Sequence, residues 1–85
     1  MTTDSTVTVR YFAAARAASG VDSEHFEATT TKQLREAMQQ RHGQRLSTVL
    51  ASCSILVDGT TAHHDEAHSL PRGATVDVLP PFAGG

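Results

Sequence analysis

The stretch "TTTKQLREAMQQRHG", residues 29–43, decides the fold because it is the clearest helix in the chain. Thr30 and Gln33 are three residues apart, which is the spacing of a capping box at a helix start. Gly43 stands where a residue in a left-handed conformation ends a helix. Between these ends, residues at helical spacing form one apolar face: Leu34, Ala37 and Met38. Such a helix must bury that face against a sheet or another helix.

Two strands are predicted before this helix. "VTVRYF", residues 7–12, alternates along its length, and its β-branched residues favour a strand. "EHFEA", residues 24–28, is a second strand with Phe26 pointing inward, so the two should pair as a hairpin. The connection "AAARAASG", residues 13–20, is rich in alanine but is interrupted by Ser19-Gly20. We therefore expect a loop or a single helical turn there.

The chain after the helix supplies the rest of a sheet. "RLSTVLAS", residues 45–52, predicts a short second helix, and "CSILVDG", residues 53–59, a central strand that ends in a tight turn. "TTAHHDEAHSLPRGA", residues 60–74, is polar and turn-rich, with room for a short strand and with Leu70 as its apolar anchor. "TVDVLPPF", residues 75–82, is the last strand, with valines on one face and Asp77 and Leu79 on the other. A sheet with one helix on one face is an α+β sandwich.

Length and composition set further expectations. With 85 residues, we expect a single domain over 1–85 that ends in an extended tail, 80–85. Seven Lys plus Arg against nine Asp plus Glu give no reason to propose nucleic acid or a membrane as partner. The first residues contain no basic region followed by an apolar run, so no signal peptide is expected. Cytoplasm is therefore the expected location.

Side chains that carry chemistry are scarce. We expect Cys53 to be a buried thiol in the core. The "HHDEAH" stretch is interpreted as a solvated loop in preference to a metal site, because adjacent side chains diverge: His63, His64, Asp65, Glu66 and His68. The remaining histidines and acidic residues are expected at turns and on the surface: Asp22, Glu24, His25, His42 and Asp58. The sequence thus predicts no self-sufficient active site and no metal.

The tail "PPFAGG", residues 80–85, is the remaining candidate. Pro80 and Pro81 cannot donate to a sheet ladder and should end the last strand. The four residues beyond them reach about 13 Å from the body, and Gly84-Gly85 lets a partner approach closely. A terminal carboxylate is a poor electrophile until it is activated, most simply as an acyl phosphate or acyl adenylate. The alternative is an inert end that happens to carry glycines.

On these residues the chain resembles a known family. It is similar to the small, sulfur-carrying subunit of molybdopterin synthase, from about Val7 to Gly85. The matching stretches are "VTVRYFAAARAASG", "LREAM", "ILVDG" and, most specifically, "LPRGATVDVLPPFAGG". The resemblance implies a ubiquitin-like β-grasp fold: a mixed sheet of four to five strands with one main helix packed on one face.

The resemblance also implies a function. A partner adenylyltransferase, related to ubiquitin-activating enzymes, uses ATP to adenylate Gly85, which is then converted to a thiocarboxylate. The large subunit of molybdopterin synthase receives the tail and transfers the sulfur to a pterin precursor. On this view the chain is a non-catalytic carrier subunit that binds no cofactor by itself.

Partner-binding residues can be carried over by position. Phe12 and Leu79 match the family's apolar docking patch, and the tail leads from it: Pro80, Pro81, Phe82, Ala83 and Gly84. Arg16 matches a frequent family arginine, with a surface ion pair as the alternative. Phe82 departs from the smaller aliphatic residue that is commoner there.

Three alternatives stay open. The chain could carry sulfur for thiazole or cysteine synthesis, be conjugated to lysines through Gly85 as a ubiquitin-like modifier, or be a β-grasp binding module with an inert tail. Prolines before the tail lean towards the molybdopterin pathway. The sequence leaves open the sulfur acceptor, the partner paralogue, the oligomeric state and whether Gly85 ends in a carboxylate or a thiocarboxylate.

Overall fold

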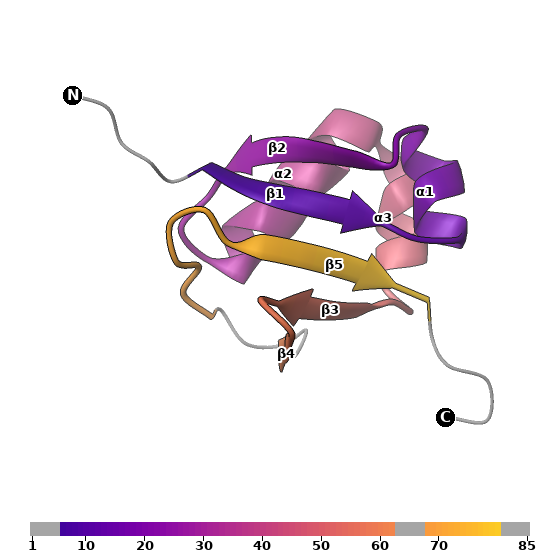
Figure 1. The fold of residues 1–85 in the computed structure, drawn as a ribbon. Helices are drawn as coiled ribbons and strands as arrows, with labels where there is room; N and C mark the ends of the chain where they lie inside the picture. The colour runs from indigo at the N-terminus through magenta and orange to yellow at the C-terminus, as the bar shows by residue number, and fades with distance from the viewer. Residues whose placement is uncertain (1–5, 63–67, 81–85) are drawn as a thin grey trace.

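The computed structural model describes residues 6–62 and 68–80 (Figure 1). Five strands and three helices follow one another along the chain. In order they are β1 (Thr6–Tyr11), α1 (Ala14–Ser19), β2 (Ser23–Glu27), α2 (Thr31–His42), α3 (Gln44–Leu50), β3 (Ser54–Val57), β4 (Thr60–Ala62) and β5 (Thr75–Leu79). None of the helices in the described ranges is long and apolar enough to cross a membrane.

The five strands form one mixed sheet in the order β2-β1-β5-β3-β4. β1 and β5 run parallel, and every other pair is antiparallel. The predicted β-grasp architecture is confirmed, including the β1–β2 hairpin. The strand predicted as central, β3, lies between β5 and the three-residue β4, while the last strand, β5, takes the middle.

The helices lie on one face of the sheet, with α2 and α3 behind the strands in Figure 1 and α1 at one end. The predicted main helix is confirmed as α2. The connection predicted as a loop or single turn is a six-residue helix, α1. It forms because Ala15 is fully buried and Ala18 packs against the core. Gly20 ends it at φ 82°, donating its N–H to the Arg16 carbonyl at 2.8 Å.

The ends of α2 differ slightly from the predicted caps. Thr30 Oγ1 accepts the Gln33 N–H at 3.1 Å, as a capping box requires. The Gln33 side chain, however, accepts from the N–H and hydroxyl of Thr29, at 2.9 and 2.8 Å. Gly43 has a positive φ of 78° but an extended ψ of −162°. It therefore ends α2 and starts α3 directly, where only glycine adopts that conformation without strain.

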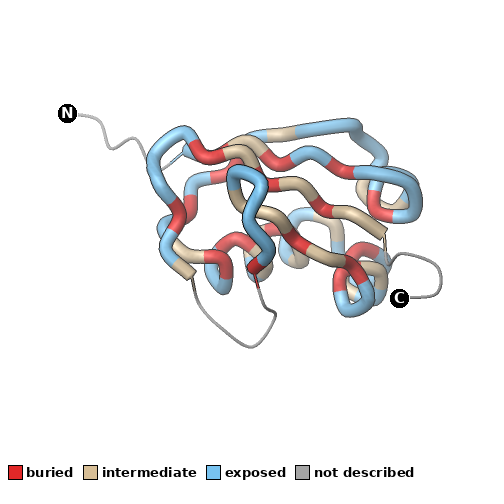
Figure 2. The backbone as a smooth tube through the Cα atoms, turned by 60° about the horizontal axis from the view of Figure 1, so that its bottom comes forward, coloured by how far each residue is buried: buried red, intermediate tan, exposed pale blue. Residues whose placement is uncertain are grey.

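The core lies between the sheet and the helices (Figure 2). Alternate residues of β1 and β5 point into it, as predicted: Val7, Val9, Tyr11, Val76 and Val78. Leu70 is buried as the expected anchor, and its N–H bonds the Thr29 carbonyl at 2.9 Å. The loop before β5 is thus fixed to the start of α2. The predicted β3–β4 turn has φ 48° at Asp58 and 87° at Gly59.

Candidate functional site

The sheet face away from the helices, here called the open face, carries two of the predicted docking residues. Tyr11 pairs with Val78 in the parallel β1–β5 ladder, and the Phe12 N–H bonds the Val78 carbonyl at 3.2 Å. That register sets Phe12 beside Leu79 where β5 ends. Phe12 is 39% exposed and is one of two exposed large apolar residues in the described ranges. The structure therefore brings the two predicted residues together next to Pro80.

An ion pair borders this apolar pair. Arg10 and Asp77 are register partners, and the guanidinium donates two hydrogen bonds to the carboxylate, Nε to Oδ1 at 2.6 Å and Nη2 to Oδ2 at 2.9 Å. These hydrogen bonds and the charge of Asp77 raise the pKa of Arg10. The Arg10 guanidinium also lies 6.0 Å from the Phe12 ring centroid. A rigid charged pair therefore flanks the aromatic ring on an exposed face.

Leu56 extends this apolar surface, although the sequence pattern did not predict it there. It pairs with Asp77 across β3 and β5, and it is only partly buried. Its position in "SILV" alternates with that of Ile55, which is buried. The near-continuous apolar run concealed that alternation. We call Phe12, Leu56 and Leu79, with Arg10 and Asp77, the open-face patch.

Arg16 lies in α1, close to one end of the open-face patch. Its Nη1 is 3.3 Å from Asp22 Oδ1, and both side chains are largely exposed. The ion pair offered as the alternative reading thus exists. Arg16 also lines a depression together with residues at the end of β1 and the start of β2: Arg10, Tyr11, Phe12, Asp22 and Ser23. Exposed ion pairs are weak. The position of Arg16 is therefore compatible with the ion pair to Asp22 and also with a contact to a partner.

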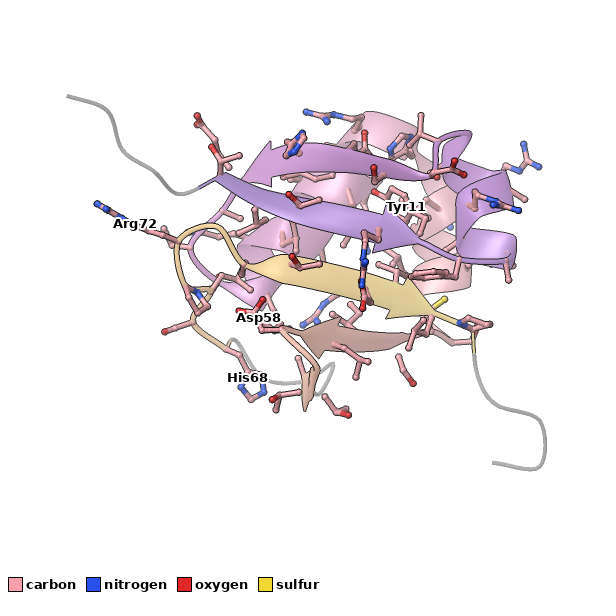
Figure 3. All side chains as sticks on the ribbon, in the orientation of Figure 1. Tyr11, Asp58, His68 and Arg72 are labelled. Atoms are coloured by element: carbon pink, nitrogen blue, oxygen red, sulfur yellow. The ribbon has the colours of Figure 1, made fainter. Side chains whose placement is uncertain are left out.

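A second cluster, centred on Glu24, contradicts the predicted surface positions of Glu24 and His42. Both side chains are nearly buried, 14% and 13% exposed. Glu24 Oε2 accepts from the Tyr11 hydroxyl at 2.6 Å and contacts His42 Nε2, while Arg41 Nη1 lies 3.2 Å from Oε1. Figure 3 labels Tyr11 at the carboxyl end of β1. The cluster thus joins β1 and β2 to the end of α2.

The protonation states in this cluster follow from its contacts. Burial raises the pKa of Glu24, but hydrogen bonds from Tyr11, His42 and Arg41 outweigh it and set the net pKa below the ordinary value. Burial and the Glu24 carboxylate raise the pKa of Tyr11. Tyr11 is therefore a neutral donor and Glu24 an ionised acceptor at neutral pH. Because Phe12 directly follows Tyr11 in the chain, the Glu24 cluster supports the edge of the open-face patch from the helix side of the sheet.

The remaining predicted side chains are placed as follows. Cys53 is buried, as expected, and burial raises the pKa of its thiol, so it is not an activated nucleophile. His25 is exposed, and Asp58 Oδ1 accepts the Thr75 N–H at 2.9 Å in its turn. The His68 N–H bonds Thr31 Oγ1 at 3.0 Å. The rest of the "HHDEAH" stretch, 63–67, lies outside the described residues, and residues 6–62 and 68–80 contain no metal-binding cluster.

The proposed reacting group also falls outside this range. Pro80 is half-buried directly after β5, and the strand ends there as its missing N–H predicts. Pro81, Phe82, Ala83, Gly84 and Gly85 lie outside the described residues. The described residues include the surface next to Pro80, after which the tail begins.

The sequence profile of the ThiS family matches residues 9–85. The chain belongs to the ThiS family. No curated protein sequence matches it significantly. Among solved structures, a candidate molybdopterin converting factor, subunit 1, from Pyrococcus furiosus is 30% identical with a TM-score of 0.78, covering 91% of this chain and 98% of that one.

Two other solved structures extend the comparison. Small archaeal modifier protein 1 from Methanosarcina acetivorans is 22% identical with a TM-score of 0.79, covering 95% of this chain and 97% of that one, and shows the shared fold. A complex of subunits 1 and 2 of molybdopterin-converting factor from Helicobacter pylori 26695 matches at 25% identity and a TM-score of 0.71, covering 94% and 99%. This ThiS-family chain is accordingly of the sulfur-carrier type, with a fold that a small archaeal modifier protein shares.

Proposed function

We propose that this ThiS-family chain is the small, sulfur-carrying subunit of a molybdopterin synthase. The observation that carries the proposal is its likeness, at 30% identity over nearly the whole of both chains, to a candidate molybdopterin converting factor subunit. The solved complex of two such subunits supports a large subunit as the partner. The proposed location is the cytoplasm.

The reacting group in this proposal is the Gly85 carboxylate. A separate adenylyltransferase uses ATP to convert it to an acyl adenylate, with release of pyrophosphate. A sulfur donor then displaces AMP and leaves a thiocarboxylate, which passes its sulfur to a pterin precursor for dithiolene formation. The chain itself holds no cofactor. A pair of terminal glycines suits this role because no side chain hinders the approach of a partner to the carbonyl carbon.

The open-face patch is the proposed docking surface. Phe12 is exposed and Leu79 beside it is partly buried, so the two offer adjoining apolar contacts before the tail, and apolar residues that reach the surface together mark contact surfaces. Docking there would place Pro80, where the described part of the chain ends, against the large subunit. Arg16, at the end of the patch, is proposed to contact a carboxylate of the partner by exchanging its exposed pair with Asp22.

Two other roles remain candidates. The fold shared with small archaeal modifier protein 1 favours a modifier attached to lysines through Gly85. Membership of the ThiS family is equally compatible with a carrier for thiazole or cysteine synthesis. In all of these the terminal carboxylate is activated first, so the recipient of the activated group distinguishes them.

One assay tests the proposal. The chain is incubated with the adenylyltransferase of its own organism, ATP and a sulfur donor, and its intact mass is measured. We expect the gain of one oxygen-to-sulfur exchange, and conversion of the pterin precursor when the large subunit is added. An unchanged mass would contradict a carrier. A charged chain that converts no pterin precursor would point to another recipient.

Deletion of Gly85 is the matched control for that assay. We expect the deletion to abolish charging and to leave the thermal unfolding midpoint unchanged, because the residue follows the strand that completes the core. A large drop in the midpoint would show that the tail is part of the folded body and would contradict its proposed role as a presented arm.

A further inference from the structure

A second depression adjoins the one that borders the open-face patch. It is lined by residues of α1 and of the connection from α1 to β2: Ala13, Arg16, Ala17, Gly20, Val21 and Asp22. Arg16 and Asp22 line the first depression as well, so the two depressions meet at this ion pair. Figure 1 shows α1 at the end of the sheet where β1 and β5 end. We call Ala13, Ala17 and Val21, with Arg16, the α1 surface.

Val21 gives the α1 surface an apolar centre. Its exposed fraction is 38%, and it is the second of the two exposed large apolar residues in the described ranges, beside Phe12. The Val21 backbone is held in place, because the Ser19 hydroxyl donates to the Val21 carbonyl at 3.1 Å and accepts the Val21 N–H at 3.3 Å. A partner can therefore cover this valine at little cost in conformational entropy.

Ala13 connects Phe12 to α1 through a strained turn. Its φ is 52° and its ψ is −122°, and the Ala15 N–H bonds the Phe12 carbonyl across it at 3.1 Å. These angles belong to the first central position of a type II′ turn, where glycine is favoured because it has no Cβ. Strain of this kind is concentrated in proteins at sites that bind ligands or partners. The turn fixes the exposed Phe12 relative to the α1 surface.

The charges where the two depressions meet favour an acidic partner group. Arg16 and Asp22 are 61% and 82% exposed, so their ion pair contributes little and is easily opened. Arg10 also lines the first depression, but its own carboxylate partner, Asp77, does not. Two guanidinium groups and one carboxylate therefore surround this depression. That excess of positive charge is complementary to a carboxylate.

We propose that the α1 surface is a second part of the docking surface for the large subunit, and that Ala13 is its positioning residue. The occupant is a segment of the large subunit with an acidic side chain between two apolar ones. The apolar side chains contact Phe12 and Val21, and the carboxylate replaces Asp22 as the partner of Arg16. The inference rests on the proposed docking at the open-face patch, with which the α1 surface is continuous through Phe12.

The affinity of the full chain for the large subunit, measured by isothermal titration, tests this surface. Val21→Asp puts a charge into an apolar contact, so we expect Kd to rise about tenfold, and less for Val21→Ser. Gln40→Asp is the control, since it adds the same charge at an exposed position of α2 outside both depressions, and it should leave Kd unchanged.

Asp22→Asn tests the chemistry of the occupant. It removes the carboxylate that competes for Arg16, so we expect Kd to fall about threefold. An unchanged or higher Kd would contradict an acidic group at this position.

Ala13→Gly separates positioning from folding. Glycine adopts a φ of 52° without strain, so we expect the thermal unfolding midpoint to rise. The turn becomes freer at the same time, so Kd should rise about threefold. Ala13→Ser keeps a Cβ at this position and should keep the Kd of the wild type. A glycine variant that is more stable and binds like the wild type would show that Ala13 does not position the surface.

The outcomes distinguish this inference from the proposed function. An unchanged Kd for Val21→Asp, with conversion of the pterin precursor retained, overturns the α1 surface alone. Slower charging by the adenylyltransferase at an unchanged Kd also overturns it, because it assigns the surface to that enzyme. A wild-type chain that binds no large subunit removes the proposed function and the α1 surface together.

Discussion

Two arginine–carboxylate contacts in this molecule are similarly exposed but differ in the other partners of the carboxylate. Arg10 and Asp77 form a bidentate pair on the open face, with the arginine side chain 52% exposed. Glu24, on β2 beside the same end of β1, pairs with a similarly exposed Arg41 but is also contacted by Tyr11 and by His42, whose side chain is 13% exposed. Water can reach both arginines, but it is largely excluded from the contacts of Tyr11 and His42 with Glu24. The Arg10–Asp77 pair therefore shapes a surface, while the Tyr11 and His42 contacts of Glu24 hold the fold together.

The largest expected effect is on the buried side of this comparison. Glu24→Ala leaves the Tyr11 hydroxyl and His42 ring without their acceptor, so we expect the free energy of unfolding to fall by about 2 kcal/mol. Denaturant titration at pH 7 measures it. Glu27→Ala, an exposed glutamate of the same strand, is the control and should change little. Equal losses of unfolding free energy for Glu24→Ala and Glu27→Ala would show that the contacts of Glu24 stabilise the fold no more than an exposed glutamate does.

A change on the open face should affect docking more than stability. Phe12→Arg removes the exposed ring beside Leu79, and we expect the affinity for the large subunit to fall about tenfold or more, some 1.4 kcal/mol. Isothermal titration measures the affinity, and thermal unfolding checks that the midpoint is retained. Unchanged binding would show that the open-face patch is not the docking surface.

Acid should act on the Glu24 cluster. The folded-state pKa of Glu24 is lowered, so the unfolded chain binds its proton first, and the stabilisation is present above the unfolded pKa of about 4.3. It is lost as the pH falls through the folded pKa. Unfolding titrations from pH 7 to pH 3 should therefore show a steeper loss for the wild type than for Glu24→Gln. Parallel curves would contradict the assignment.

The smallest effect is expected for Asp77→Asn. It removes the charge that pairs with Arg10, but the Arg10 side chain is 52% exposed and the amide oxygen can still accept from it, so we expect no resolvable change in the unfolding midpoint. Charging of Gly85 should also be unchanged. A clear drop in the midpoint would place this exposed pair in the same class as the Glu24 cluster.

Much of the fold could be predicted from local patterns. The alternation at Val7, Val9 and Tyr11, the cap at Thr30 and the Asp58-Gly59 turn each depend on residues close in sequence, and each is present. The buried Cys53 and the exposed Phe12 follow from the same alternation and from residue type. Phe12 and Leu79, 67 positions apart, were expected on one face only through the family resemblance.

The Glu24 cluster could not be predicted in this way. Glu24 is 17 and 18 residues from Arg41 and His42, and no local period relates them. Each looks like a polar surface residue at the end of its element. Only the packing of α2 across β2 and β1 brings them together and keeps the contact of His42 with Glu24 largely away from water.

By itself, then, the sequence determined the order of strands and helices, their α+β pattern and the glycine pair at 84–85, because composition and short-range periodicity carry these properties. The β-grasp fold was expected only through the family resemblance. The tertiary structure alone decided that β5 takes the middle of the sheet and that its end adjoins Phe12. It also decided that the Glu24 carboxylate lies among Tyr11, Arg41 and His42 while Asp77 pairs with Arg10 on the open face. Burial and strand order arise from contacts between distant segments, and those contacts set the dielectric surroundings of each charge.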